Sequence, residues 1–457
     1  MFKYGLIGRD IEYSHSERIH KIIGDYDYEL LDVQNEDELE ALLRDGTYCG
    51  FNVTTPYKKS VIKYMDELSE TARRVGAVNT ISRTVDGKLI GYNTDVDGFV
   101  KTAHERAANR KCLILGTGGA ALAVAEGLEN LKASEIIFAS RDPNNVSDEL
   151  KAKYKVVSYD ELNKHYDVQV IINATPVGLQ RTIEQSPITN VGRSLRSFAS
   201  LEFAMDLIYN PYRTKFIQDA RRLTGCKTAS GLEMLIHQAI SSRNIWKDAR
   251  NMSLFEKVAT SAIKRRLLVH QLNIVAVGMP GSGKTSIFRK YATEMGLEFI
   301  DIDKETEKLM GESIETVLKR EDGEEYFRQY EQKAVMEACK HNHAVIATGG
   351  GSILNPVSRD MLRANGIVIY VRRPLDKLAI QGRPLSEEYG VEELFEKRDT
   401  IYRKVSDICI DNNITFGETF DKKGNKNSYT YDMKKFVYGV KTSIDKYIFN
   451  IAGNKWV

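Results

Sequence analysis

The sequence predicts an α/β protein of several domains, and three observations lead to this prediction. The 457 residues are too many for one ordinary hydrophobic core, so two to four domains are expected. Short apolar runs alternate with helical patterns along most of the chain, which is typical of sheets covered by helices. Two of these runs end in glycine-rich loops that lead into helical segments, a pattern typical of phosphate-binding α/β folds.

The composition favours small-molecule chemistry. With 65 Lys and Arg against 63 Asp and Glu, the chain has no basic footprint for nucleic acid or an anionic membrane. Its five cysteines are far apart and form no Cys-x-x-Cys pair, which argues against a zinc site or a disulfide framework. No apolar run approaches membrane-spanning length and the first residues read as a strand, so we expect a cytoplasmic protein. The sequence leaves the oligomeric state open.

The first 93 residues predict a helix-covered, largely parallel sheet. Strand candidates alternate with the helical patterns Glu36–Arg44 and Ser60–Val75, an order typical of an α/β layer. The strand candidates are Tyr4–Ile7, Tyr28–Val33, Gly50–Val53, Thr80–Ser82 and Leu89–Tyr92.

The first glycine-rich loop follows the apolar run Lys111–Leu115. It reads Gly116-Thr-Gly118-Gly119-Ala120-Ala121 and precedes a helical pattern and a further strand candidate, Ile136–Ser140. The order strand, glycine loop, helix, strand predicts a Rossmann-type dinucleotide fold. Arg141 follows the second strand, where a cation can pair with a ribose 2′-phosphate, so this position favours NADP. An uninterrupted helical stretch, Gly231 to about Leu268, then closes the first half.

The second loop, after an apolar run that begins at Leu272, matches the phosphate-loop pattern. It reads Gly278-Met-Pro-Gly281-Ser282-Gly283-Lys284-Thr285. Glycines at these places let successive N–H groups point at a phosphate, and the following helix N-terminus adds partial positive charge. We expect a nucleoside triphosphate, with Lys284 at the outer phosphates and Thr285 on Mg²⁺.

Residues 1 to about 260 resemble the shikimate dehydrogenase family. Besides the glycine loop, the ordered matches are Tyr13-Ser14-His15-Ser16, Gly50-Phe-Asn52-Val-Thr54-Thr-Pro56-Tyr-Lys58, Gly76-Ala-Val-Asn79-Thr80, Gly91-Tyr-Asn93-Thr94-Asp95, Asn173-Ala-Thr175-Pro-Val-Gly178, Asp206-Leu-Ile-Tyr209-Asn-Pro211 and Gly231-Leu-Glu-Met234-Leu-Ile-His-Gln238. The resemblance implies a substrate domain at 1–100, a Rossmann-type NADP domain at 101–230 and a helical segment at 231–268 that packs back on the substrate domain.

The same resemblance implies the residues of a dehydrogenase site. Lys58 and Asp95 would be the catalytic pair, since a lysine beside a carboxylate can supply and recover the proton that a reduced ketone requires. Neutral donors orient a polyol without adding charge, and the implied substrate-binding residues are Ser14, Ser16, Thr54, Asn79 and Gln238. The implied dinucleotide-binding residues are Gly116, Gly118, Gly119, Ala120, Arg141, Thr175, Tyr209 and Gly231.

Residues from about 272 resemble shikimate kinase, which implies a phosphate-loop α/β domain with a parallel sheet at 269–457. Besides the loop, the matches are Phe299-Ile-Asp301-Ile-Asp303, Gly323-Glu-Glu-Tyr-Phe-Arg328-Gln-Tyr-Glu331, Thr348-Gly349-Gly350-Gly351, Gly382-Arg383-Pro384-Leu385 and Arg398-Asp-Thr-Ile-Tyr402. Asp301 and Asp303 lie at alternate positions after an apolar run, so on a strand both would project to one side.

The kinase resemblance also implies roles. Asp303 would be the catalytic base and bind shikimate, Arg383 would neutralise charge on the transferring phosphoryl group as a lid closes, and Asp301 and Thr285 would lie at the metal. Arg328 and Arg398 would clamp the substrate carboxylate, with Gly350 close to the substrate ring. The nucleotide cradle would be Gly278, Gly281, Ser282, Gly283, Lys284 and Thr285. The segment before Arg383 is shorter than in the family, Gln381 stands where an adenine-contacting arginine is often found, and a polar insertion follows Asn412.

The expected function is bifunctional: NADP-dependent reduction of 3-dehydroshikimate to shikimate, then phosphorylation of shikimate with MgATP. One alternative is a non-enzymatic sensor of quinate or shikimate built from the same domains. The nearer alternative is a quinate/shikimate dehydrogenase that uses NAD, because Asp142 places a like charge beside the position expected for the 2′-phosphate.

Overall fold

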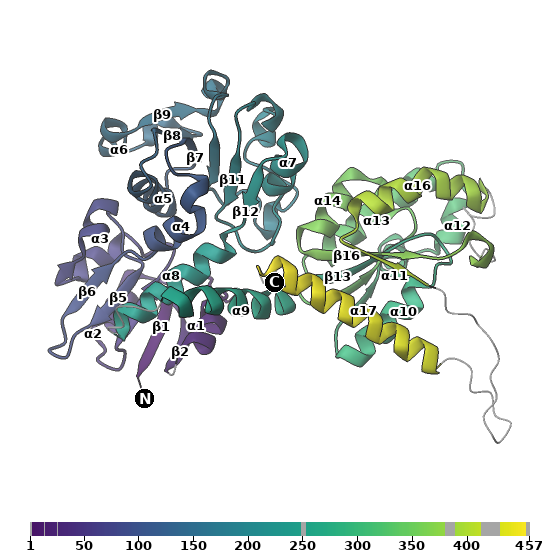
Figure 1. The fold of residues 1–457 in the computed structure, drawn as a ribbon, viewed down its shortest axis with the longest axis horizontal. Coiled ribbons are helices and arrows are strands. Elements are labelled where there is room, and N and C mark those ends of the chain that lie inside the picture. The colour runs from purple at the N-terminus through teal and green to yellow at the C-terminus, as the bar shows by residue number, and fades with distance from the viewer. Residues whose placement is uncertain are drawn as a thin grey trace. The chain divides into compact units, whose positions relative to one another are not determined.

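The computed structural model describes residues 2–12, 14–24, 26–247, 253–379, 389–412 and 430–453. The chain divides into two compact units, Met1–Leu267 and Leu268–Val457, and the division falls within helix α9 (Ser253–Gln271). The first unit contains two six-stranded sheets and the second contains one five-stranded sheet (Figure 1). The protein is therefore mixed α/β with parallel sheets. In the part of the chain described, no helix is long and apolar enough to cross a membrane.

The first sheet is largely but not wholly parallel, because three of the strand pairs described, including β4 with β6, are parallel and two are antiparallel. Its order is β2-β1-β3-β5-β6-β4; β1 pairs in parallel with β2 and β3, whereas β5 is antiparallel to both β3 and β6. The strands are β1 Lys3–Gly8, β2 Asp27–Asp32, β3 Gly50–Val53, β4 Glu67–Leu68, β5 Thr80–Arg83 and β6 Leu89–Tyr92. Its helices are α1 Ser16–Ile23, α2 Glu36–Arg44, α3 Glu70–Val75 and α4 Asp95–Ala103.

The prediction of one continuous helix over Ser60–Val75 is wrong for the middle of that range. A 3₁₀ helix covers Ser60–Tyr64, the short strand β4 follows, and α3 begins only at Glu70. Asp66 explains the interruption, because its N–H donates to the carbonyl of Leu89 at 2.9 Å and its carboxylate accepts from Leu89 N at 2.8 Å. This pairing with β6 outweighs the local helical pattern.

The second sheet of the first unit is entirely parallel, in the order β12-β11-β10-β7-β8-β9. Alternate residues of its strands build a core on each face: Leu113 and Leu115 pack on one side, Cys112 and Ile114 on the other. The elements are β7 Lys111–Leu115, α5 Gly119–Asn130, β8 Glu135–Ser140, α6 Asp148–Lys153, β9 Lys155–Ser158, β10 Val170–Asn173, β11 Phe203–Asp206, α7 Lys215–Thr224 and β12 Lys227–Ala229. Helix α8 (Gly231–Trp246) follows, and residues 248–252 of the expected uninterrupted helix lie outside the described residues.

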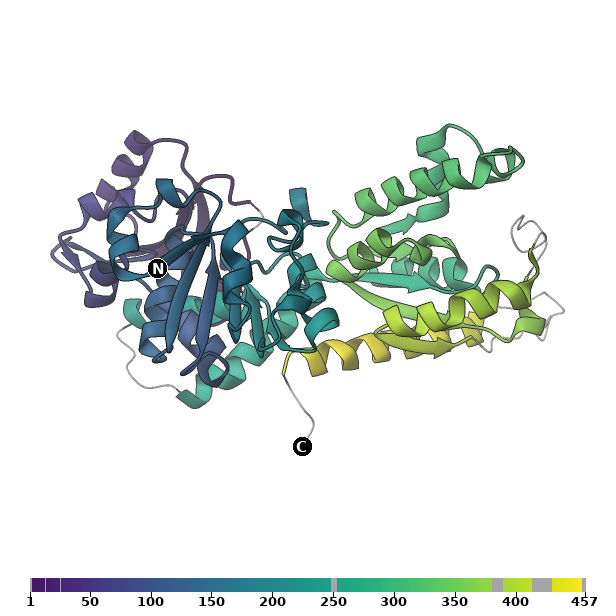
Figure 2. The same cartoon turned by 90° about the horizontal axis from the view of Figure 1, so that it is seen from above.

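The second unit has a parallel sheet in the order β14-β15-β13-β16-β17, with helices on both faces (Figure 2). The central strand β13 is buried along its whole length, as its apolar run predicted. The elements are β13 Asn273–Val277, α10 Lys284–Met295, β14 Phe299–Asp301, α11 Ile302–Met310, α12 Ile314–Leu318, α13 Gly323–Ala338, β15 Val345–Ala347, α14 Pro356–Ala364, β16 Gly366–Arg372, α16 Val391–Val405, β17 Ile408–Asp411 and α17 Thr430–Ile451.

Candidate active sites

A small pocket in the first unit brings together all the side chains predicted to hold the dehydrogenase substrate. It has a volume of about 110 Å³. The predicted residues that line it are Ser14, Ser16, Thr54, Lys58, Asn79, Asp95, Gln238 and Tyr209. Ser14 and Ser16 lie at the start of α1, Thr54 and Lys58 in the loop after β3, and Asn79 just before β5. Asp95 lies in the first turn of α4, Gln238 on α8 and Tyr209 in the segment after β11. Tyr13, which belongs to the first motif, lies outside the described residues.

Lys58 and Asp95 form an ion pair inside this pocket. Lys58 Nζ lies 2.6 Å from Asp95 Oδ2, and the two side chains are 19% and 10% exposed. Asp95 is the first residue of α4, where the helix dipole favours a negative charge. Asn79 Nδ2 donates to the other oxygen, Asp95 Oδ1, at 2.8 Å. The carboxylate is therefore held in one orientation, with its charge directed at the lysine.

A buried polar network surrounds Asn79 and includes residues for which sequence analysis proposed no role. Asn79 Oδ1 accepts from Thr94 N at 2.7 Å. Behind it, Asn52 Nδ2 donates to Ser242 Oγ at 2.8 Å, and the Thr80 and Ser242 hydroxyls lie 2.8 Å apart. Asn52, Thr80 and Thr94 belong to the quoted motifs, so the signal was present. Ser242 gave no signal, because it joins the network from α8, far along the chain.

The glycine loop after β7 fits a dinucleotide pyrophosphate. Gly116 has φ +100°, and a Cβ there would lie 3.0 Å from Thr175 Cγ2, so the turn favours glycine. Helix α5 begins at Gly119 with no side chain capping its N-terminus, and a Cβ on Gly118 or Gly119 would meet nothing within 4 Å. The N–H groups of the first turn, including that of Ala120, are thus suited to bind phosphate.

The neighbourhood of Arg141 bears on the choice between NADP and NAD. Arg141 is exposed, and the carboxylate of Asp142 accepts from Asn144 N at 3.1 Å and Asn145 Nδ2 at 2.9 Å. Asp142 therefore caps the short 3₁₀ turn Pro143–Asn145. Its oxygens are therefore turned toward this turn, and the carboxylate retains its negative charge.

A larger cavity, of about 440 Å³, lies at the phosphate loop of the second unit. The predicted residues that line it are Gly281, Gly283, Lys284, Thr285, Asp303, Arg328, Gly350 and Arg398. Gly278 and Ser282 belong to the loop without lining the cavity, and Asp301 also lies outside the lining. Arg383 and Gln381 lie outside the described residues, as does the insertion at 413–429.

The loop geometry fits the phosphates of a nucleoside triphosphate. Gly278, Gly281 and Gly283 have backbone φ values of +151°, +77° and +86°, which residues other than glycine rarely adopt. Lys284 is the first residue of α10 and is buried, so its charge lies at the N-terminus where anions bind. Thr285, the next residue of the helix, also lines the cavity.

The two acids after the second unit's loop do not share a strand, which corrects the expectation. Strand β14 ends at Asp301, and Asp303 lies in the first turn of α11. Asp303 faces the cavity. Burial raises the pKa of Asp303 to about 6, and the negative charges of Glu331 and Asp301 contribute to the rise. The positive charge of Lys284 acts in the opposite direction. Asp301 instead lies 3.4 Å from Arg289 Nη2.

Arg328 is oriented by acidic neighbours. Its Nη1 lies 2.7 Å from Glu331 Oε2, and its Nη2 lies 3.2 Å from Glu324. Glu331 is buried and also accepts from Ser352 Oγ at 2.6 Å. Glu331 was part of the quoted motif, but no role was assigned to it. Arg398, the second predicted clamp, is buried on α16 and faces the same cavity.

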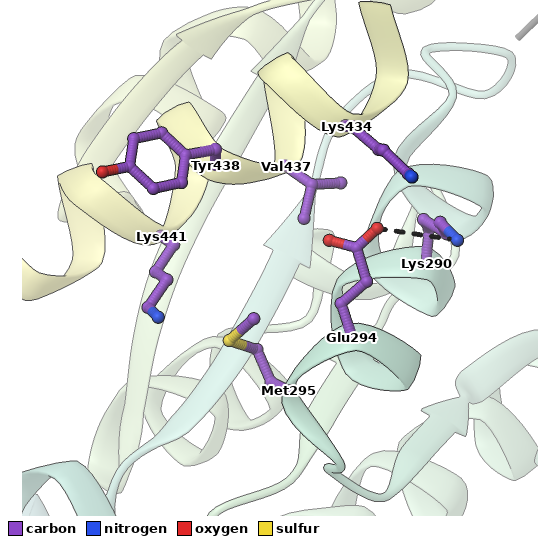
Figure 3. A pocket seen from close by; sticks show the side chains of 7 residues that line it. All are labelled: Lys290, Glu294, Met295, Lys434, Val437, Tyr438 and Lys441. Atoms are coloured by element: carbon purple, nitrogen blue, oxygen red, sulfur yellow. Dashed lines mark ion pairs between the residues drawn. The ribbon is translucent and has the colours of Figure 1, made fainter. Parts of the chain in front are cut away.

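A further hollow, of about 510 Å³, lies between α10 and α17 (Figure 3). Lys290 and Glu294 form an ion pair at 3.5 Å along α10. From α17 the hollow is lined by Lys434, Val437, Tyr438 and Lys441. None of its lining residues belongs to either predicted site.

The two units define two classes of enzyme fold. The first joins a substrate pocket to a Rossmann-type dinucleotide loop, and the second is a phosphate-loop kinase. Residues 6–81 match the family model for the shikimate dehydrogenase substrate-binding domain, and residues 280–424 match that for shikimate kinase.

Similar proteins agree with these matches. Shikimate dehydrogenase (NADP(+)) of Caldicellulosiruptor bescii is 35% identical over 272 residues, which are 55% of this chain and 92% of that protein. The solved chorismate mutase/shikimate 5-dehydrogenase fusion protein of Clostridium acetobutylicum is 36% identical, with a TM-score of 0.53 over 58% of this chain and 98% of its own. Shikimate 5-dehydrogenase of Thermus thermophilus, solved with NADP(H) and shikimate, is 27% identical, with a TM-score of 0.50 over 57% of this chain and 100% of its own.

The chain belongs to the shikimate dehydrogenase family, and its second unit carries a shikimate kinase domain. It is an enzyme of both types, which leaves the non-enzymatic sensor without support.

Proposed function

We propose that the first unit reduces 3-dehydroshikimate to shikimate with NADPH, and that the second unit transfers the γ-phosphoryl group of MgATP to the shikimate 3-hydroxyl. The observation that carries the proposal is the Lys58–Asp95 ion pair, 2.6 Å long, in a pocket otherwise lined by neutral hydrogen-bonding side chains and a few apolar ones. This arrangement suits a hydroxylated ring with one proton to be moved.

In the dehydrogenase step, the dinucleotide supplies the hydride. The Lys58 ammonium donates a proton to the substrate oxygen as the carbonyl becomes a hydroxyl, and in the reverse direction the lysine takes that proton back. Asp95 orients the ammonium, because Asn79 and the start of α4 hold its carboxylate in one position. The substrate ring is oriented by Ser14, Ser16, Thr54 and Gln238.

NADP is the proposed dinucleotide. Arg141 is exposed at the end of β8 and the Asp142 carboxylate is bound within its own turn, so a phosphate beside Arg141 would meet a cation. The C. bescii relative is named for NADP(+), and the T. thermophilus structure contains NADP(H) and shikimate.

In the kinase step, Asp303 accepts the proton of the attacking hydroxyl. Burial raises its pKa to about 6, nearer to neutral pH than that of an ordinary aspartate, which suits a general base. Lys284 and the loop N–H groups stabilise the charge on the phosphates. Arg328 and Arg398 face the cavity together and would bind the substrate carboxylate as paired cations. Arg383 and the metal roles of Thr285 and Asp301 remain part of the proposal.

A coupled assay tests the proposal: dehydroshikimate, NADPH and MgATP are supplied, and shikimate 3-phosphate is measured. Lys58→Ala should lower shikimate oxidation by about 10²–10⁴-fold, the usual contribution of a proton-transfer group, while kinase turnover with added shikimate persists. Lys284→Ala should do the reverse. Loss of both activities from either change would show that the two sites are not independent. Faster turnover of quinate with NAD than of shikimate with NADP would favour the quinate/shikimate dehydrogenase.

A further inference from the structure

Asp206 is a fully buried carboxylate to which neither proposed reaction assigns a role. It is the last residue of β11 and lies opposite Asn173, the last residue of the neighbouring parallel strand β10. The carboxyl ends of parallel strands carry the binding loops of α/β folds. Asp206 therefore lies beneath two such loops, the one after β10 and the one after β11.

Three donor groups bind the Asp206 carboxylate. Thr214 Oγ1 donates to Oδ2 at 2.6 Å, Ile208 N donates to Oδ1 at 3.0 Å, and Asn173 Nδ2 lies 3.1 Å from each oxygen. Burial raises the pKa of Asp206 to about 7, and these donors oppose the rise because they favour the ionised form. The carboxylate is thus a buried acceptor that binds the end of β10, the segment after β11 and the N-cap of α7.

One of these contacts leads to the dinucleotide loop. While Asn173 Nδ2 is bound by Asp206, its Oδ1 accepts from Thr175 N at 3.0 Å and from Thr175 Oγ1 at 2.6 Å. The Thr175 methyl group lies 3.0 Å from where a Cβ on Gly116 would be. The orientation of Asn173 therefore sets the position of Thr175 against the glycine loop.

A second contact leads to the substrate pocket. The carbonyl of Ile208, whose N–H is bound by Asp206, accepts from Gly231 N at 3.0 Å at the start of α8. A Cβ on Gly231 would lie 1.9 Å from Leu207 O, so this segment and α8 are packed backbone to backbone. The next residue, Tyr209, lines the substrate pocket, as does Gln238 two turns along α8.

We propose that Asp206 is a positioning residue that holds the dinucleotide-facing loop after β10 and the substrate-facing segment after β11 in one fixed arrangement. Asp206 contacts neither the dinucleotide nor the substrate. It acts on the dinucleotide loop through Asn173 and Thr175, and on the substrate pocket through Ile208 and Tyr209. This proposal rests on the proposed dehydrogenase function.

Asp206→Asn tests the proposal with little change of shape. The new amide keeps one acceptor oxygen, and in either orientation its NH2 group faces the Asn173 donor. The negative charge that strengthens the bond from Ile208 N is also lost, so both loops are held less firmly. Shikimate oxidation is measured for kcat and for the KM of each substrate, NADP affinity is measured by fluorescence titration, and kinase turnover of the same preparation reports an intact second unit. We expect both KM values to rise about tenfold, the effect of one lost positioning hydrogen bond, with kinase turnover unchanged.

The matched control is Asp219→Asn, which alters another buried carboxylate of the same unit, on α7, paired with Lys215 and Arg222. Its KM values should stay within about twofold of wild type. Asn173→Ala removes the bonds of Asn173 to Asp206, Val177 O and Thr175 but leaves Asp206 bound to Thr214 and Ile208. It should raise the NADP KM alone, which also tests the proposal if Asp206→Asn does not fold. Unchanged KM values in Asp206→Asn, a rise in only one of them, or an unchanged NADP KM in Asn173→Ala would each overturn it. Failure of the proposed function is separate, because wild type would then not oxidise shikimate with NADP.

Discussion

His20 is a buried histidine whose replacement should change how the stability of the first unit depends on pH. It is fully buried on α1, its ring is stacked on Tyr28 with a centroid separation of 4.0 Å, and Nδ1 lies 2.8 Å from the Tyr26 hydroxyl. Its Nε2 has no hydrogen-bond partner among the described residues. Burial lowers the pKa of His20 to about 3, and the nearby Asn52 side chain acts weakly in the opposite direction.

The sign and size of the effect follow from linkage. The folded pKa is below the unfolded value of about 6.5, so the unfolded chain binds the proton first. Stability is unaffected by His20 above pH 6.5 and falls as the pH drops from 6.5 towards 3. A pH of 5 is about 1.5 units below the unfolded pKa, and each unit corresponds to about 1.4 kcal/mol. Protonation of this histidine in the unfolded chain alone should therefore lower the free energy of unfolding by about 2 kcal/mol at pH 5 relative to pH 8.

The measurement is urea unfolding at pH 8 and pH 5, followed by the fluorescence of Trp246, which lies beside His20. The chain has two tryptophans, so a Trp456→Phe background isolates this signal. His20→Gln should lower the free energy of unfolding at both pH values. Between pH 8 and pH 5, however, the free energy of unfolding should fall by about 2 kcal/mol less in His20→Gln than in wild type. His104→Gln, at an exposed histidine of the same unit, should leave the pH dependence of wild type. Equal losses on acidification in wild type and His20→Gln would refute the reasoning.

Three further outcomes are expected. Arg74→Leu should destabilise the first unit by about 2 kcal/mol, because buried Glu126 loses the partner 2.7 Å away; the double change with Glu126→Leu should recover most of the loss in urea unfolding. Gly281→Ala, with φ +77° and a Cβ 2.4 Å from Ala379 O, should raise the kinase KM for ATP at least tenfold. Gly296→Ala, also at positive φ but in open space, should cost only about 1 kcal/mol of stability and leave that KM unchanged. Arg141→Ala should raise the KM for NADP about tenfold and leave that for NAD unchanged in steady-state assays.

Local features of the fold were accessible to sequence reasoning. Helix α2 spans Glu36–Arg44 as its pattern predicts, and Asn35 caps it by accepting from Glu38 N. The run at β13 is buried and leads through the phosphate loop into α10. These features are readable because hydrophobic period, capping and positive-φ glycines act over a few neighbouring residues.

Features that depend on distant partners were not accessible in the same way. The helical pattern at Ser60–Val75 is interrupted because Asp66 pairs with Leu89. Ser242 enters the polar network from α8, and nothing in its own neighbourhood indicates that role. The motif containing Asp206 was visible in the sequence, but the three donors that surround its carboxylate come together only in the fold.

The sequence by itself determined the α/β class, the two phosphate-binding loops and the residue types available for proton transfer and carboxylate binding. Tertiary structure decided what those residues do to one another: it set Lys58 and Asp95 2.6 Å apart, placed Asp303 in a helical turn where burial raises its pKa, and oriented Arg328 between two glutamates. The reason is physical. Backbone conformation is specified largely by near neighbours, whereas distance, burial and charge environment are set by segments that meet only when the chain folds.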